Sequence, residues 1–126
     1  MILSVGIDIA DVSRFRAAIE RHPRMLERLF TPLEREGLEK KADGASSMAA
    51  RFSAKEAALK ALGCGWGKGV GWTDVEILSA QNGAPVVVLH AMAKEIFLSR
   101  GGGRIHVSMT HDGGNAAAVI IIESGE

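Results

Sequence analysis

Two glycine-containing turns constrain the fold of this chain more than any other feature of its sequence. Each turn joins two short apolar runs, which are residues 73–79 and 85–89 around Asn82-Gly83, and residues 104–109 and 115–122 around Asp112-Gly113-Gly114. Asparagine, aspartate and glycine tolerate the positive φ angles that tight hairpin turns require. We therefore expect two antiparallel hairpins in the C-terminal half of the chain.

The other segments predict one further strand and several helices. Residues 1–9 form an apolar run that alternates poorly, as expected of a strand buried on both faces. Helices are predicted where caps, breakers and periodicity agree: from Asp11 or Ser13 to His22, a short one to about Phe30, one opening at Thr31-Pro32, one from Ser46 or Ser47 through Leu62, and one over 90–100. We expect a single α+β domain over residues 1–126, with about five strands in a mostly antiparallel sheet and helices packed on it.

Composition excludes several functional classes. Acidic and basic residues balance at 15 each, so the chain as a whole has no charge that would attract nucleic acid or an anionic membrane. The longest apolar stretch, residues 116–122, is far shorter than the roughly 20 residues of a membrane helix. Asp8 interrupts the N-terminal apolar run, so that run is not a signal peptide. Cys64 is the one cysteine, which fits a reducing compartment, and we expect a cytoplasmic protein.

Asp8 is the first candidate functional residue. A carboxylate near the end of a buried strand is unfavourable unless it is paired, metal-bound or in contact with water. Two interpretations are open at this point. Asp8 is either a helix cap or ion-paired acid at a strand-to-helix turn, or it is a metal ligand.

Residues 51–63, with the sequence RFSAKEAALKALG, predict an amphipathic helix. At about 100° per residue, Phe52, Leu59 and Leu62 form the buried stripe, and Glu56 lies at its edge. Glu56 and Lys60 are i,i+4 neighbours with the acid first, which taken alone predicts an ordinary surface ion pair.

The combination of these residues indicates phosphate chemistry. Asp8 and Glu56 are two hard oxygen ligands bordering apolar surface, while Arg51, Lys55 and Lys60 place cations on the same predicted helix. Two carboxylates with water suit Mg²⁺, which commonly bridges to phosphate oxygens. Carboxylates, a metal and lysines are the groups that cleave a phosphoanhydride by positioning and charge neutralisation.

Arginines are concentrated after the first predicted strand. Arg14, Arg21, Arg24 and Arg28 are spaced by seven, three and four residues, which aligns them if the helices there share a direction. Such charges usually form a solvated helix face, but in a chain without net charge they also suit an acidic macromolecular partner. The histidines are weaker signals, because His106 and His111 are an odd number of residues apart and would face opposite sides of one strand.

Several of these segments resemble the signatures of holo-acyl-carrier-protein synthases, which are 4′-phosphopantetheinyl transferases. Gly6-Ile7-Asp8-Ile9 followed by Arg14-Phe15 is similar to the N-terminal signature, and residues 51–63 are similar to the second. Three smaller matches follow in the same order: residues 74–77 (DVEI), 82–85 (NGAP) and 106–111 (HVSMTH). The resemblance covers nearly the whole chain.

The resemblance implies an enzyme that moves the 4′-phosphopantetheine group of coenzyme A onto a serine of apo acyl carrier protein, releasing 3′,5′-ADP, in fatty acid biosynthesis. It implies a homotrimer of the phosphopantetheinyl transferase fold with active sites between subunits. Asp8 and Glu56 would bind Mg²⁺ or Mn²⁺, and Lys60 would neutralise the departing nucleotide. Coenzyme A would also contact Arg51, Gly63 and His111. Arg14, Arg21, Arg24 and Arg28 would dock the acidic recognition helix of the carrier.

The chain departs from its larger relatives at Ala10, where they carry a further acidic ligand, so water must complete the metal shell. Asp11 is not expected to replace that ligand, because strand parity points it elsewhere. The glycine-rich loop 64–71, with Trp66 and Lys68, is a candidate for closing over coenzyme A. Two alternative functions use the same metal site: a Mg²⁺-dependent nucleotide pyrophosphate hydrolase, which needs no arginine run, and a non-catalytic nucleotide-binding module.

Overall fold

The computed structural model describes residues 1–64 and 69–125, so Trp66 and Lys68 of the predicted loop fall outside the described part of the chain. Its elements in chain order are β1 (Ile2–Asp11), α1 (Val12–Arg21), α2 (Met25–Leu29), α3 (Pro32–Glu39), α4 (Gly44–Leu62), the 3₁₀ helix η1 (Trp72–Asp74), β2 (Val75–Ser79), β3 (Pro85–Leu89), α5 (Ala91–Ser99), β4 (Gly102–Asp112) and β5 (Asn115–Ser124). The fold is α+β with antiparallel strands, as the sequence predicts.

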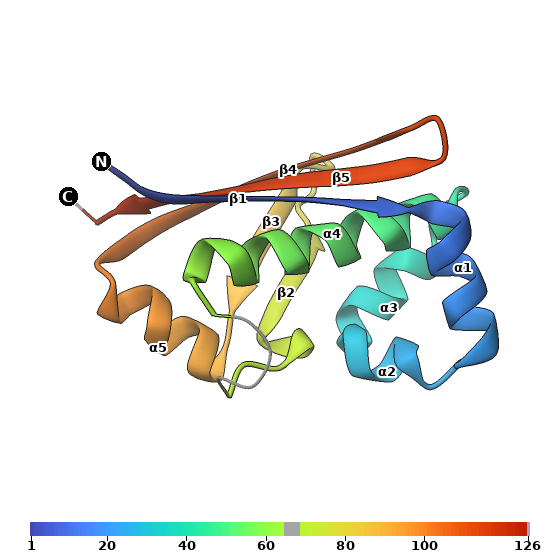
Figure 1. The fold of residues 1–126 in the computed structure, drawn as a ribbon, viewed down its shortest axis with the longest axis horizontal. Coiled ribbons are helices and arrows are strands. Elements are labelled where there is room, and N and C mark those ends of the chain that lie inside the picture. The colour runs from blue at the N-terminus through green and yellow to red at the C-terminus, as the bar shows by residue number, and fades with distance from the viewer. Residues whose placement is uncertain (65–68, 126) are drawn as a thin grey trace.

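The five described strands form two sheets, and the expectation of one sheet is wrong in this respect. β1, β5 and β4 lie side by side in that order, and β2 pairs with β3 alone. Both predicted hairpins are present, because their turns are local features: Gly83, Gly113 and Gly114 all have positive φ. The division of the strands into two sheets depends on tertiary packing instead. α4 contacts both sheets, and α5 lies between the two hairpins in the chain (Figure 1).

β1 is buried on one face only, contrary to the expectation from its apolar run. Val5, Ile7 and Ile9 are 56%, 67% and 66% exposed on the outer face of the sheet, which no described element covers (Figure 1). The inner face carries small or polar residues because α4 packs closely against it. A Cβ atom placed on Gly6 would lie 1.9 Å from the carbonyl oxygen of Ala57. The poor alternation of the sequence therefore reflects an apolar outer face, not burial on both sides.

The central helix α4 runs between the three-stranded sheet and the remaining elements. It begins at Gly44, before the predicted caps Ser46 and Ser47, and ends at Gly63, whose φ of 72° is the left-handed conformation of a C-cap. Alanines 54, 57, 58 and 61 are all buried, so α4 is covered on more than the predicted stripe. Among the described residues, no helix combines the length and apolar character needed to cross a membrane.

Local capping explains the N-terminal helices. The Asp11 side chain accepts a hydrogen bond of 2.9 Å from the amide of Arg14 and caps α1. Thr31 caps α3 in a reciprocal capping box with Glu34. The predicted starts of both helices are confirmed.

Candidate active site

Asp8, Glu56 and Arg14 line one cavity of about 340 Å³ between β1, α1 and α4. Asp8 comes from the inner face of β1, Glu56 from α4 and Arg14 from the first turn of α1. Phe15 and Phe52 form an aromatic part of the wall, with ring centroids 5.2 Å apart. The fold thus places two carboxylates and a guanidinium around a hollow that is partly apolar.

Lys60 holds Asp8 in place. Its Nζ donates hydrogen bonds of 3.0 Å to the Asp8 carboxylate and 2.9 Å to the carbonyl of Ile7. The Asp8 side chain is 18% exposed and that of Lys60 is 56% exposed, so the ammonium group faces solvent and remains open to a ligand. Asp8 is therefore an ion-paired acid, one of the two interpretations that the sequence left open, and it also faces the cavity.

Glu56 is half-buried, and its electrostatic surroundings disfavour the charged form. Burial raises the pKa of Glu56, the nearby charge of Asp8 raises it further, and the charge of Lys60 opposes both effects. The ion pair of Lys60 is with Asp8, not the surface pair with Glu56 that i,i+4 spacing predicts. Because the negative charges of Asp8 and Glu56 repel each other, a cation bound between the two carboxylates would be stabilised.

The residues around this cavity fit a hard divalent cation. Asp8 and Glu56 supply carboxylate oxygens, and Ala10 has no side-chain ligand to add. Asp11 also lines the cavity, but its carboxylate caps α1 at the Arg14 amide. Within residues 1–64 and 69–125, no group of three or more His, Cys, Asp or Glu side chains is arranged to hold a metal. Two carboxylates completed by water suit Mg²⁺ better than they suit a metal that prefers nitrogen or sulfur ligands.

Arginines line a second cavity next to the first. Arg21, Arg24 and Arg28 surround about 550 Å³ at the junction of α1 and α2, together with His22. Met25 lines both this cavity and the one that contains Asp8. Three of the four arginines singled out in the sequence therefore lie together, and the fourth, Arg14, lies at the neighbouring carboxylate cavity.

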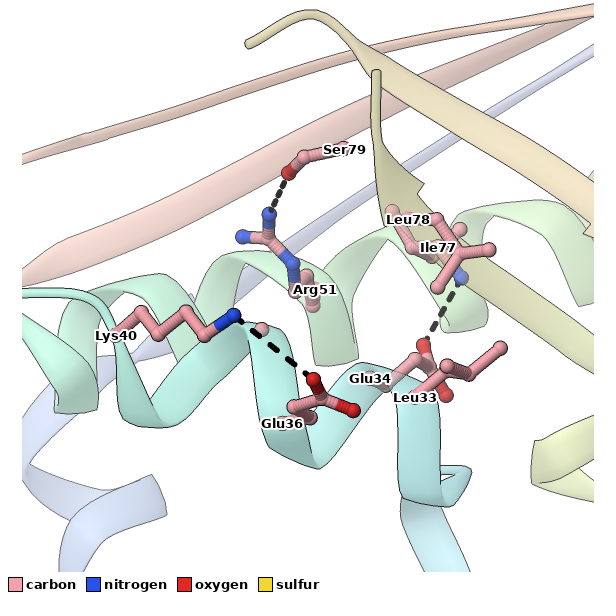
Figure 2. Close-up of a pocket in the computed structure, with 9 residues that line it drawn as sticks. Leu33, Glu34, Glu36, Lys40, Arg51, Ile77, Leu78 and Ser79 are labelled. Atoms are coloured by element: carbon pink, nitrogen blue, oxygen red, sulfur yellow. Dashed lines mark hydrogen bonds and ion pairs between the residues drawn. The ribbon is translucent and has the colours of Figure 1, made fainter. Parts of the chain in front are cut away.

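Arg51 lies elsewhere, on a side of α4 that faces α3 and β2 (Figure 2). Arg51 as a residue is 9% exposed, and its Nη2 donates a 3.0 Å hydrogen bond to the hydroxyl of Ser79. Burial lowers the pKa of Arg51, while the charge of Glu34 opposes this. The surrounding cavity of about 280 Å³ shares no lining residue with the one that contains Glu56. Arg51 and Glu56 are five residues apart on α4, so their side chains point about 140° apart around the helix axis.

The remaining predicted site residues also lie outside the carboxylate cavity. His111 approaches the start of α4, with its Nε2 3.9 Å from the Asp43 carboxylate. His106 instead pairs with Glu123 at 2.5 Å. At Gly63, the space that a Cβ would occupy is taken by the Arg100 guanidinium, within 2.6–2.9 Å. The structure therefore brings Asp8, Glu56, Lys60 and Arg14 together, and does not bring Arg51, His111 or Gly63 into the same cavity.

Lys55, one of the three cations predicted on this helix, does not face the carboxylate cavity. Its side chain has no exposed surface and pairs with Glu34, whose side chain is also fully buried. The sequence did carry a signal for this burial. Lys55 lies three residues after Phe52 and four before Leu59, so helical periodicity places it within the buried stripe.

Known proteins resemble this chain over nearly all of its length. The sequence profile of the 4′-phosphopantetheinyl transferase superfamily matches residues 4–119. A holo-[acyl-carrier-protein] synthase of Moorella thermoacetica is 46% identical over 123 residues, which are 98% of this chain and 95% of the relative.

Solved structures agree with the sequence comparison. The holo-[acyl-carrier-protein] synthase of Neisseria meningitidis superimposes with a TM-score of 0.89 at 25% identity, covering 98% of this chain and 100% of the other. The enzyme of that name from Helicobacter pylori, solved in complex with coenzyme A, gives a TM-score of 0.82 at 32% identity, covering 94% and 99%.

Proposed function

The chain belongs to the 4′-phosphopantetheinyl transferase superfamily and is a transferase, and on that premise we propose that it moves the 4′-phosphopantetheine group of coenzyme A to a serine of an apo acyl carrier protein. The observation that carries this proposal is the joint placement of Asp8, Glu56 and Arg14 around one cavity, with Lys60 bonded to Asp8. The carrier we propose is that of fatty acid biosynthesis, and the compartment is the cytoplasm.

In the proposed reaction, the serine oxygen of the carrier bonds to the phosphorus that bears pantetheine. The bond between that phosphorus and the oxygen of 3′,5′-ADP breaks, and the hydroxyl proton leaves to a base that we do not assign. Lys60 is placed to neutralise the departing phosphate, because its exposed ammonium group is anchored by Asp8 and the carbonyl of Ile7.

We propose that Asp8 and Glu56 bind Mg²⁺, or Mn²⁺ in its place, with water as the remaining ligands. Burial and then the charge of Asp8 raise the pKa of Glu56, and a cation between the two carboxylates would offset both effects. The chemistry that a bound divalent cation supplies there is neutralisation of charge on the pyrophosphate of coenzyme A.

The carrier is proposed to dock on the arginines of α1 and α2. Arg21, Arg24 and Arg28 line one cavity, and Arg14 lies at the adjoining carboxylate cavity, so a carrier bound to the first three would present its serine towards the second. Charges that steer an acidic partner chiefly affect its encounter and its orientation.

We propose that the nucleotide end of coenzyme A contacts Arg51 and His111 and that its chain passes Gly63. Arg51 lies in a cavity separate from that of Glu56, so a complete site is proposed to form between two copies of the chain in a homotrimer. The exposed outer face of β1 supports this assembly. Val5 and Ile7 stand opposite Ile121 and Val119 of β5, which makes an apolar surface of the kind that subunits cover.

The intact mass of a purified apo acyl carrier protein, incubated with this protein, coenzyme A and Mg²⁺, tests the proposal. We expect a mass gain of one phosphopantetheine group, lost when a chelator removes the metal. Glu56→Gln should remove most of the rate. If several carriers gain no mass while coenzyme A is hydrolysed, the protein is a pyrophosphate hydrolase; if coenzyme A is only bound, it is a binding module.

The double variant Arg21→Glu/Arg24→Glu tests the docking surface, because both residues line the arginine cavity and neither lines the carboxylate cavity. We expect the carrier KM to rise by about 100-fold or more, because two attractive charges become repulsive, while the affinity for coenzyme A is retained. Titration calorimetry with coenzyme A and steady-state kinetics with the carrier separate these two effects. An unchanged carrier KM would remove the arginines from the docking surface.

A further inference from the structure

A fully buried ion pair lies directly behind the candidate active site. Lys55 Nζ contacts the Glu34 carboxylate at 2.8 Å, the carbonyl of Trp72 at 3.0 Å and the carbonyl of Val75 at 2.5 Å. All three donors of the ammonium group therefore have partners, and these come from α3, η1 and β2. The Glu34 carboxylate also accepts hydrogen bonds of 2.9 Å from the amides of Thr31 and Ile77.

Stability alone does not explain this pair. Removing two charges from water is expensive, and well-packed apolar residues of similar volume often stabilise a protein as well or better. What an ion pair adds is a defined orientation between the elements it joins, because each hydrogen bond fixes an angle as well as a distance.

Orientation matters on α4 because much of its buried surface restricts rotation only weakly. The surfaces that it buries are largely alanine, at positions 54, 57, 58 and 61, and apolar burial is non-directional. Alanine side chains give a helix shallow ridges, so neighbouring elements interlock little with it. Lys55 makes three hydrogen bonds in the middle of this helix, to Glu34, Trp72 and Val75. On the same helix Arg51 donates one to Ser79, and Lys60 donates two, to Asp8 and Ile7. Among these three donors, Lys55 is the one whose side chain has no exposed surface.

Glu56 directly follows Lys55, so its direction depends on the rotation of α4. Successive side chains on a helix are separated by about 100°, which turns Glu56 from the α3 and β2 side towards Asp8 on β1. With side chains, a helix is about 10–12 Å across, so a rotation of about 10° displaces a surface group by about 1 Å. Mg²⁺ requires near-ideal ligand geometry, so a shift of this size matters for two carboxylates that share one ion.

The same pair supports the aromatic wall of the cavity. Lys55 bonds to the backbone of Trp72, and the Trp72 ring lies 5.3 Å from the Phe52 ring. Phe52 in turn packs on Phe15 and lines the cavity with Asp8 and Glu56.

We propose that Lys55 and Glu34 are positioning residues, a buried pair that sets the rotation of α4 so that Glu56 faces Asp8. The inference rests on the proposed function in one respect: Asp8 and Glu56 must bind one cation. Both side chains lack exposed surface and lie outside the carboxylate cavity, although Glu34 is among the residues around the Arg51 cavity.

The test compares Lys55→Met and the uncharged double variant Lys55→Met/Glu34→Gln with the wild type. Phe97→Leu is the matched control, because it opens a small defect in the core at α5 and leaves the pair intact. Melting temperature, Mn²⁺ affinity in the presence of coenzyme A, and kcat and KM for the carrier are measured at a temperature where all four proteins are folded.

We expect both pair variants to bind Mn²⁺ about 10- to 100-fold more weakly, as when an outer residue that orients a metal ligand is removed. Their kcat should fall by about 100-fold, the effect of a displacement near 1 Å, with the carrier KM unchanged. Phe97→Leu should lose melting temperature alone. The inference is overturned if the pair variants behave like Phe97→Leu, or if all variants lacking the pair lose the folded state, because the pair would then serve stability only.

Crystal structures of the wild type and the double variant separate this inference from the proposed function. A rotation of α4 that moves Glu56 away from Asp8 supports the positioning role even if the wild type transfers no phosphopantetheine. An unchanged α4 in a double variant that has lost Mn²⁺ affinity would overturn the positioning role and leave the transferase proposal intact.

Discussion

Gly6 occupies the point where β1 and α4 approach most closely, and its side chain can be no larger than hydrogen. We expect Gly6→Ala to destabilise the fold by about 1–3 kcal/mol, because the added Cβ would meet the Ala57 carbonyl at 1.9 Å and neither backbone can move freely. The same displacement should move Asp8, two residues along, away from Glu56. Thermal unfolding followed by circular dichroism measures the loss of stability.

Gly37→Ala is the control, since no atom lies within 4 Å of the position where its Cβ would be. Within helix α3 this change should stabilise the protein by up to about 1 kcal/mol, because alanine is the better helix former. Equal destabilisation by both substitutions would rule out the steric explanation for Gly6.

Between elements, Glu76 on β2 joins α3 to the start of α5. Its carboxylate accepts hydrogen bonds of 2.5 Å from Thr31 and 3.0 Å from His90. Burial raises the pKa of Glu76, but these hydrogen bonds and the charges of His90 and Lys55 together outweigh it, so the pKa lies below its ordinary value. The stability from this carboxylate is therefore present above the ordinary glutamate pKa and is lost as pH falls through the lowered value.

Glu76→Gln should cost about 1 kcal/mol near neutral pH, the net contribution of one such hydrogen bond. The difference from wild type should shrink as pH falls below the ordinary glutamate pKa, since the protonated wild type loses the same contribution. Calorimetric unfolding of both proteins from pH 7 to pH 3 measures this difference. A gap that stays constant over that range would show that the charge of Glu76 contributes nothing to stability.

Elements that depend on local chemistry were predictable, and those that depend on tertiary packing were not. The turn residues at 82–83 and the caps at Asp11 and Thr31 define their strand and helix ends within a few residues, so the sequence located them. Whether two hairpins share one sheet depends on what packs between them, and no local pattern records it. Asp8 and Glu56 stood out as polar residues beside apolar stripes. Helical periodicity also places Lys55 in the buried stripe, but it does not identify its partner, Glu34, on another helix.

At the scale of the whole molecule, the outer face of β1 should govern assembly. We expect Val5→Glu to convert the proposed trimer to monomers, because it places a charge within an apolar surface that subunits would bury. Leu98→Glu, at an equally exposed apolar position on α5, is the control and should leave the trimer intact. Sedimentation equilibrium gives the mass of each species, and a trimeric Val5→Glu variant would place the interface elsewhere.

Mixing two inactive variants tests whether a site is shared between subunits. Glu56→Gln and Arg51→Ala damage separate cavities, so exchanged trimers should contain some interfaces with both intact halves and regain part of the wild-type rate. Activity measured after mixing and subunit exchange gives the result. No recovery, with exchange verified by native mass spectrometry, would mean that one chain supplies both halves of its own site.

The order of the strands has a consequence for how the protein is made. β1 pairs with β5, so Ile2 lies opposite Glu123, and the strand that carries Asp8 finds its ladder partner far along the chain. The hairpins and helices can form from neighbouring residues, but this pairing must close a loop of nearly the whole chain, which slows folding. A nascent chain therefore leaves β1 without its ladder partner until β5 has been synthesised, and the candidate active site is among the last features to form.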